Sequence, residues 1–164
     1  MSDGTSQASD ERVVTSVAEL KDLVGQEIGV TDWFEVTQER VNLFADATGD
    51  HQYIHVDPER AKQTFFGGTI AHGYLTLSLI PELGKTRKGV KIQLGGKMGV
   101  NYGLNRVRFP APVHVGKRIR MRTTLLAVEE IGDRAVQMTS QQTIEVEGEE
   151  RPACVAETVG RTYF

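Results

Sequence analysis

The segment from Gly73 to about Arg87 constrains the fold most, because it is apolar on nearly all sides. Its sequence over residues 73–85 is Gly-Tyr-Leu-Thr-Leu-Ser-Leu-Ile-Pro-Glu-Leu-Gly-Lys. A helix that is apolar all round is typical of a protein core rather than a surface. Pro81 has no amide hydrogen to donate, so it should kink this helix or end its first half. We therefore expect a helix buried by the rest of the chain.

Strand-like patterns follow this segment. Residues 97–101 and 105–109 have the pattern of strand pieces on either side of Gly103. Longer strands are predicted over 118–128, 136–146 and 153–163. A sheet with one concave apolar face would bury a single apolar helix. This order predicts an α+β fold in which an antiparallel sheet wraps around a long central helix.

The N-terminal half is predicted to be mainly helical. Helices are expected over 17–24, 37–48 and 57–63, and a strand is expected over 28–36. Ser16, Thr37 and Asp57 are the N-cap candidates, and Gly49 suits the left-handed C-cap of the second helix. Residues 49–57 are predicted to form a loop between two helices.

Composition and charge exclude several classes. A chain of 164 residues fits one domain, predicted over 15–164 after a flexible tail at 1–14. The formal charge of -3 gives no sign of a nucleic-acid-binding surface, and no apolar run is long enough to cross a membrane. The N-terminus lacks the features of a secretory signal, and Cys154 is the only cysteine, so we expect a cytoplasmic protein without an intrachain disulfide. Cys154 is expected to be a small buried side chain.

The candidate site lies in residues 49–73, which contain three of the four histidines. Asp50 and His55 are five residues apart in the predicted loop. A carboxylate and an imidazole have ordinary pKa values of about 3.9 and 6.5, so together they suit acid and base catalysis near neutral pH. Gly73 opens the apolar helix, where a free backbone amide is able to stabilise an oxyanion.

A metal site is the alternative for this cluster. Its residues are of types that ligate metals: Asp50, His51, His55, Asp57 and His72. His51 and His55 lie in a segment predicted as a loop and so offer no helical pair of metal ligands, and no cysteines support a site, so no metal is expected. His72 is expected to support the start of the helix. His51 is expected to face solvent or the partner of a dimer, and His114 is expected at the surface.

The run Gly49-Asp50-His51-Gln52-Tyr53-Ile54-His55, together with Ile70-Ala71-His72-Gly73, resembles the motif of the MaoC-like dehydratases, the (R)-specific enoyl-CoA hydratases. Members described as nodulation protein N-like look particularly close. The resemblance extends over roughly residues 20–163 and includes residues 101–109. Gln52-Tyr53 stands where the commonest form of the motif has Asn-Pro, which bears on the shape of the loop and on substrate fit.

The resemblance implies a hotdog fold and a homodimer with sites near the subunit interface. It implies reversible hydration of a trans-2-enoyl-CoA to an (R)-3-hydroxyacyl-CoA. Asp50 and His55 would activate one water, and the Gly73 amide would stabilise the thioester oxygen. Coenzyme A would be part of the substrate, and no metal or other cofactor would be needed.

Substrate contacts and the remaining alternatives are less constrained by the sequence. The candidate substrate-binding residues are Tyr53, Asn101, Arg106 and Arg108. The arginines suit the phosphates of coenzyme A. Phe65 and Phe66 are candidates for the border of an acyl tunnel. Two other functions remain open: an acyl-CoA thioesterase with the same fold, and an acyl-CoA-binding domain without catalysis.

Overall fold

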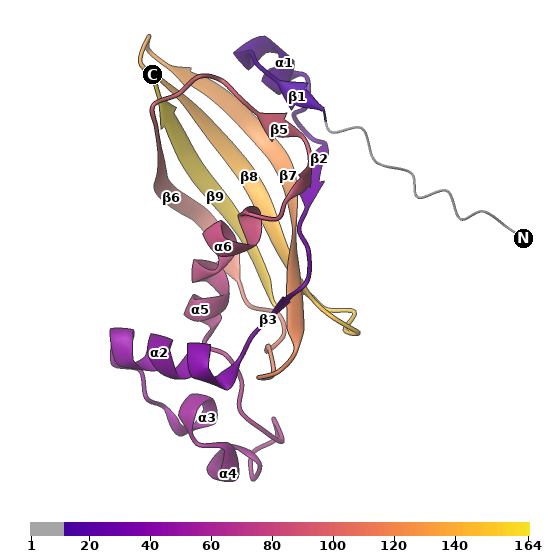
Figure 1. The fold of residues 1–164 in the computed structure, drawn as a ribbon, viewed down its shortest axis with the longest axis vertical. Coiled ribbons are helices and arrows are strands. Elements are labelled where there is room, and N and C mark those ends of the chain that lie inside the picture. The colour runs from indigo at the N-terminus through magenta and orange to yellow at the C-terminus, as the bar shows by residue number, and fades with distance from the viewer. Residues whose placement is uncertain (1–11) are drawn as a thin grey trace, which may run out of the picture.

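One large antiparallel sheet dominates the molecule (Figure 1). The structure, a computed structural model, describes residues 12–164. Seven strands form the sheet in the order β4-β2-β7-β8-β9-β6, with β3 also paired to β7. They are β2 (Glu27–Val30), β3 (Phe34–Glu35), β4 (Lys88–Gly89), β6 (Met98–Arg108), β7 (Arg118–Ile131), β8 (Ala135–Val146) and β9 (Cys154–Tyr163). The predicted antiparallel sheet is confirmed, while the strand expected over 28–36 is divided into β2 and β3.

The two faces of the sheet differ in chemistry. On β7, Ile119, Met121 and Leu125 are buried on one face. Between them, Arg120 and Arg122 both contact the carboxylate of Glu145 on β8, at 2.6 and 2.7 Å. Alternate side chains of a strand point to opposite faces, so one face packs on the core and the other carries ion pairs.

β6 is the edge of the sheet and is continuous, whereas the sequence suggested two pieces. It pairs with β9 from Met98 to Arg108, with register shifts on both sides of Gly103. These shifts in strand register lie in the stretch around Gly103 that separates the two predicted strand pieces. Three large apolar or aromatic side chains on this strand, Met98, Tyr102 and Leu104, are between 49% and 57% exposed.

The helices are α1 (Val17–Lys21), α2 (Gln38–Thr48), α3 (Tyr53–Val56), α4 (Pro58–Ala61), α5 (Gly73–Ser78) and α6 (Ile80–Gly84). Helices α5 and α6 lie against one face of the sheet, whereas the other helices lie at its two ends (Figure 1). Within residues 12–164, none of the helices combines the length and hydrophobicity needed to cross a bilayer. The start of α2 at Thr37 and its end at Gly49 are as predicted: Thr37 accepts from the Arg40 amide, and Gly49 has φ 78°.

The central helix is broken into α5 and α6 at Leu79, just before Pro81. The stripe formed by Leu75, Leu79 and Leu83 is buried in the main core with β7, β8 and β9. Tyr74 on the other side is 71% exposed. The expectation of a helix buried all round is therefore wrong for this single chain, in which one side of the helix stays uncovered.

The folded part begins earlier than residue 15. β1 (Val13–Val14) pairs in parallel with β5 (Lys91–Ile92), and Val14 is fully buried. Val14 packs with Leu20, Leu23 and Leu125 in a second apolar cluster. The predicted tail boundary at 14 is thus wrong by at least two residues, and residues 1–11 lie outside the described part of the chain. Figure 1 shows β1 and α1 at the end of the sheet opposite to α2, α3 and α4.

Cys154 is fully buried at the start of β9, as expected for a small core side chain. Burial raises the pKa of its thiol to about 11. The thiol therefore stays protonated at neutral pH, and the thiolate is the nucleophilic form. These two observations place Cys154 in the packing of the sheet.

Candidate active site

Asp50 is positioned by the end of α2. The Gly49 amide donates to the Ala45 carbonyl at 2.8 Å, and the left-handed conformation of Gly49 turns the chain out of the helix. One carboxylate oxygen of Asp50 accepts from the Gln52 amide at 3.3 Å. The side chain is 52% exposed. Its carboxylate therefore keeps contact with solvent while its backbone is held in a tight turn.

His55 lies on α3, in the stretch for which the sequence predicted a loop. The short helix follows the turn at Asp50 and buries His55, which is 7% exposed. Its Nδ1 lies 2.7 Å from the carbonyl oxygen of Ile70. A carbonyl only accepts, so Nδ1 carries the proton and Nε2 presents a lone pair. The local helix corrects the predicted loop, and it places one free imidazole nitrogen in the site.

His72 packs directly on His55. The two ring centroids are 3.9 Å apart and the rings are stacked, with an interplanar angle of 26°. Nε2 of His72 lies 2.9 Å from the backbone oxygen of Asp50, and the side chain is 3% exposed. Because that oxygen only accepts, Nε2 is the protonated nitrogen. His72 thereby connects the start of α5 to the Asp50 turn and forms one wall around His55.

The pKa of His55 is lowered from 6.5, chiefly by burial and further by His72, although the hydrogen bond to Ile70 and the charge of Asp50 act in the opposite direction. His51 has the opposite shift: its hydrogen bond to Asp46, at 2.7 Å, raises its pKa. His51 is 53% exposed, as predicted. At neutral pH His55 is therefore the uncharged imidazole next to the carboxylate.

The site has donor atoms of Asp50, His55 and His72 within 4.8 Å of one another. Such a set of residue types suits several metals. However, a metal lies about 2.0–2.1 Å from an imidazole nitrogen and in the plane of the ring. Two stacked rings 3.9 Å apart present their lone pairs in nearly parallel planes. This geometry favours acid–base chemistry over joint ligation, and the absence of a metal stays a prediction.

Gly73 is the first residue of α5, where an amide has no partner inside the helix. Among the hydrogen bonds of residues 12–164, none uses the Gly73 N–H. The ring of Phe109 lies beside this residue: a Cβ added to Gly73 would meet Phe109 ring carbons at 3.1 Å. Glycine therefore leaves room between the amide and the aromatic ring.

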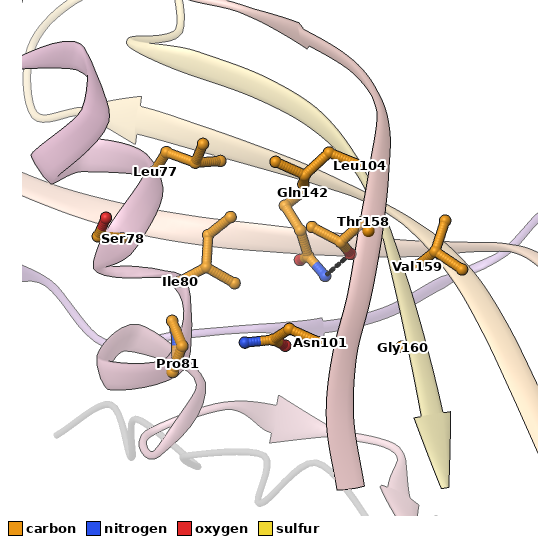
Figure 2. A pocket seen from close by; sticks show the side chains of 11 residues that line it. Leu77, Ser78, Ile80, Pro81, Asn101, Leu104, Gln142, Thr158, Val159 and Gly160 are labelled. Atoms are coloured by element: carbon orange, nitrogen blue, oxygen red, sulfur yellow. Dashed lines mark hydrogen bonds between the residues drawn. The ribbon is translucent and has the colours of Figure 1, made fainter.

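A cavity of about 270 Å³ contains both His55 and Gly73. Its other lining residues are Phe66, Ile70, Ala71, Thr76, Phe109, Pro110, Ala111, Pro112, Val113 and Ala153. A larger cavity, of about 530 Å³, lies further along α5 and α6 and contains none of the proposed catalytic residues (Figure 2). The smaller cavity therefore holds two of the predicted catalytic groups, His55 and Gly73, while Asp50 lines neither of the two.

The predicted substrate-binding residues are dispersed. Tyr53 contributes its ring to a contact with the Arg60 guanidinium, at 4.3 Å. Asn101 lines the larger cavity, and Arg106 and Arg108 line a separate hollow on β6 and β9. None of the four lines the cavity that holds His55.

Two of the other candidates behave differently from expectation. Phe66 lines the His55 cavity, while Phe65 is 92% exposed. His114 is not an ordinary surface residue: its Nε2 lies 2.9 Å from the Phe66 carbonyl oxygen, and its backbone forms a β-bridge with Ile70. His114 therefore helps to fix the segment whose carbonyl orients His55.

Sequence reasoning missed Gln38 on α2. Its amide nitrogen donates to the His55 carbonyl oxygen at 2.7 Å, and its amide oxygen accepts from the Thr69 hydroxyl at 2.6 Å. It joins α2, α3 and the segment before α5. Its position in the first turn of a helix carries no functional signal, so only the tertiary structure reveals it.

Comparison with known proteins identifies relatives over almost the whole chain. The MaoC like domain matches residues 19–147. The 3-hydroxyacyl-thioester dehydratase Z of Mycobacterium tuberculosis is 55% identical over 150 residues, covering 92% of this chain and 97% of the relative. Nodulation protein N of Rhizobium leguminosarum bv. viciae is 46% identical over 150 residues, covering 91% and 92%. The structure of an (R)-hydratase from A. caviae involved in PHA biosynthesis aligns with a TM-score of 0.64 and 28% identity, covering 84% of this chain and 94% of that one.

The opposite pKa shifts of His51 and His55 predict the order in which they titrate. We expect His55 to gain its proton below pH 6.5 and after His51 as the pH falls. Because its folded pKa is lowered, His55 favours the folded state above pH 6.5 and this stability is lost as the pH falls towards the folded pKa. NMR titration of the imidazoles, assigned with His51→Gln and His55→Gln variants, measures both midpoints. A midpoint of His55 above that of His51 would contradict the environment described.

Proposed function

Since the chain belongs to the MaoC-like domain family of dehydratases, with a hotdog fold, we propose that it is an (R)-specific enoyl-CoA hydratase. The reaction is the reversible addition of water to a trans-2-enoyl-CoA, which gives an (R)-3-hydroxyacyl-CoA. The observation that carries the proposal is the free Nε2 of a neutral, buried His55 next to the Asp50 carboxylate. An (R)-hydratase with 28% identity supports the same reaction class.

Asp50 and His55 bind and activate one water in this proposal. The water donates a hydrogen bond to the His55 Nε2 and another to the Asp50 carboxylate, since both are acceptors. As its oxygen adds to C3 of the enoyl chain, one of its protons passes to the pair. The pair delivers a proton to C2 from the same face, so the elements of water add syn and the pair ends in its starting protonation state.

The Gly73 amide stabilises the charge that develops on the thioester oxygen. When the water oxygen bonds to C3, electrons move through C2 to that oxygen, which becomes enolate-like. A backbone N–H already aimed at it stabilises this charge without reorganisation. The acid, base and amide all come from the protein, so no cofactor is needed beyond the coenzyme A of the substrate.

The Asp50 and His55 roles predict a specific pattern of losses. Asp50→Asn and His55→Gln should each lower kcat/KM for crotonyl-CoA by about 100-fold or more, because each removes a proton acceptor. His51→Gln is the matched control and should keep nearly normal activity, since His51 is bonded to Asp46 at the surface. Hydration is followed by the loss of enoyl-thioester absorbance, and thermal melting checks the fold. Near-normal turnover of both variants would rule out the assignment, and release of free thiol would indicate a thioesterase instead.

Gly73 gives a second, independent test. Gly73→Ala should reduce kcat/KM by about tenfold or more, because its new Cβ meets Phe109 at 3.1 Å and crowds the amide that receives the oxyanion. Gly84→Ala, on α6, adds the same methyl group where nothing lies within 4 Å. Steady-state kinetics on both variants measure the difference. Equal activity of the two would remove Gly73 from the mechanism.

We also propose that two copies assemble into a homodimer through β6. This strand is at the edge of the sheet, so its outer backbone groups are free to pair with a second strand. Met98, Tyr102 and Leu104 expose apolar surface along it, and Tyr74 does so on α5. Natural proteins usually protect a long edge of this kind, and a second copy would cover both features.

The dimer is tested at Leu104, which is 49% exposed on β6. Leu104→Lys should weaken association because a buried, unpaired charge is costly at an interface. Leu43→Lys is the control, since Leu43 is 62% exposed on α2, away from β6. Sedimentation velocity over a range of concentrations should show a dimer for the wild type and the control, and a monomer or weaker dimer for Leu104→Lys. A monomeric wild type would refute the proposal.

A further inference from the structure

A band of polar side chains crosses the inner face of the sheet between its two apolar clusters. Thr123 on β7 is 1% exposed and Gln142 on β8 is 8% exposed. On one side of them lies the cluster packed on α5 and α6, and on the other lies the cluster with Val14 and Leu20. A sheet face that only needed to pack would carry apolar residues here. These polar residues therefore call for an explanation beyond stability.

The band is joined by hydrogen bonds that all run in one direction. The Thr123 hydroxyl donates to the Gln142 amide oxygen at 2.7 Å. The Gln142 amide nitrogen donates to the Thr158 hydroxyl at 3.3 Å, and Thr158 donates in turn to the Ser140 carbonyl at 3.2 Å. This chain fixes the orientation of the Gln142 amide. Since an amide NH₂ has two hydrogens, one N–H of Gln142 remains available.

Gln142 and Thr158 lie on one wall of the cavity of about 530 Å³ (Figure 2). The opposite wall is formed by Leu77, Ile80 and Pro81 of α5 and α6. Asn101 of β6 also lines this cavity, and Figure 2 shows its amide pointing towards Pro81. Among residues 12–164, no hydrogen bond involves the Asn101 side chain. Two amide donors thus face one largely apolar space.

The larger cavity lies further along the same helix and strands than the cavity that contains His55. Gly73 and Leu77 are four residues apart on one face of α5, and Ile80 follows at the start of α6. Ala153, which directly precedes β9, lines the smaller cavity, and Val159 of β9 lines the larger one. In the same way, Phe109, which directly follows β6, lines the smaller cavity, and Leu104 of β6 lines the larger one. The two cavities therefore lie one after the other along the same parts of the chain.

The distance along the helix from Gly73 to the larger cavity indicates which carbon of the acyl chain would reach the polar band. At 1.5 Å per residue, Leu77 and Ile80 lie about 6 and 10 Å beyond Gly73 along the axis. A chain of tetrahedral carbons with bonds of about 1.5 Å advances about 1.3 Å per carbon. An acyl chain whose carbonyl is held at Gly73 would meet the band about five to eight carbons beyond the thioester carbon, at about its sixth to ninth carbon.

We propose that the polar band of Thr123, Gln142 and Thr158, with Asn101, selects acyl thioesters that carry a keto or hydroxyl oxygen about five to eight carbons from the thioester. The inference rests on the proposed hydratase function. An oxygen at this position accepts from the Gln142 and Asn101 amides, whereas a plain alkyl chain desolvates them without a partner. A site built to hydrogen-bond a substrate group discriminates against the analogue that lacks it.

The test compares a matched pair of substrates with the full-length protein. The pair is trans-2-octenoyl-CoA and 7-oxo-trans-2-octenoyl-CoA, which differ only in the keto oxygen. We expect the wild type to prefer the oxo compound by about tenfold in kcat/KM, which corresponds to one hydrogen bond retained rather than lost. Gln142→Met should bring this ratio close to one. Asn101→Leu, at an exposed position of β6, should reduce it in the same direction, and sedimentation velocity checks that this variant keeps the assembly of the wild type.

Gln141→Met is the matched control, because Gln141 is the neighbouring glutamine on the opposite face of β8 and should keep the wild-type ratio. Octanoyl-CoA and 7-oxooctanoyl-CoA have no double bond to hydrate. Calorimetric measurement of their dissociation constants therefore tests the same selectivity in binding alone. Hydration of crotonyl-CoA reports separately on the proposed function. Equal turnover and equal binding of the two eight-carbon chains by a protein that hydrates crotonyl-CoA would overturn the inference and leave the hydratase intact. Preferred binding of the oxo compound without any hydration would support the polar band and refute the hydratase.

Discussion

The hydrogen bond from His55 to the Ile70 carbonyl, 2.7 Å long, is the interaction on which the site depends. It determines which imidazole nitrogen carries the proton, and so it leaves Nε2 as an acceptor. Burial then keeps the ring neutral by lowering its pKa. A different tautomer would present an N–H where the proposed reaction requires a lone pair. One backbone carbonyl, placed by the fold, thus decides the chemistry of the side chain.

The rest of the structure holds that carbonyl in place. The β-bridge between Ile70 and His114 connects its segment to the turn before β7, and the Ile70 amide donates to the Ile54 carbonyl at 3.0 Å. Gln38 links α2 to both α3 and Thr69. His72 closes the arrangement by reaching back to the Asp50 backbone. Leu75 and Leu79 pack into the core on the inner face of the sheet and so fix the position of α5. The start of α5, the Asp50 turn and the His55 ring are therefore all held by the same core.

Much of this architecture follows from local sequence patterns. The caps at Thr37, Gly49 and Asp57 are where residue type predicted them, because an N-cap oxygen or a left-handed glycine acts on its own neighbours. The strands predicted over 118–128, 136–146 and 153–163 likewise correspond to β7, β8 and β9. The motif also identified, from sequence alone, residues that the structure brings together: Asp50, His55 and His72 lie side by side, and His55 and Gly73 line one cavity.

The remaining features depend on contacts between distant segments, so no local pattern encodes them. The short helix around His55 is held by Gln38 from another helix, and residues 53–56 alone lack a helical pattern. Val13 and Val14 become a strand only because Lys91 and Ile92 offer a partner. The polar band at Gln142 was also hidden, since a glutamine within a strand does not indicate which face it occupies. The exposed side of α5 was also not predictable, because an apolar sequence pattern does not indicate whether the residues that bury a helix come from the same chain or from another one.

The stereochemistry of the reaction tests the central claim most directly, because the proposed pair of Asp50 and His55 would act from one face of the substrate. Crotonyl-CoA is hydrated in D₂O by the wild-type protein, and the configurations of the product at C3 and C2 are determined. The account predicts an (R)-3-hydroxybutyryl-CoA in which deuterium at C2 and oxygen at C3 have been added to the same face. An (S) product, or deuterium delivered to the opposite face, would contradict it.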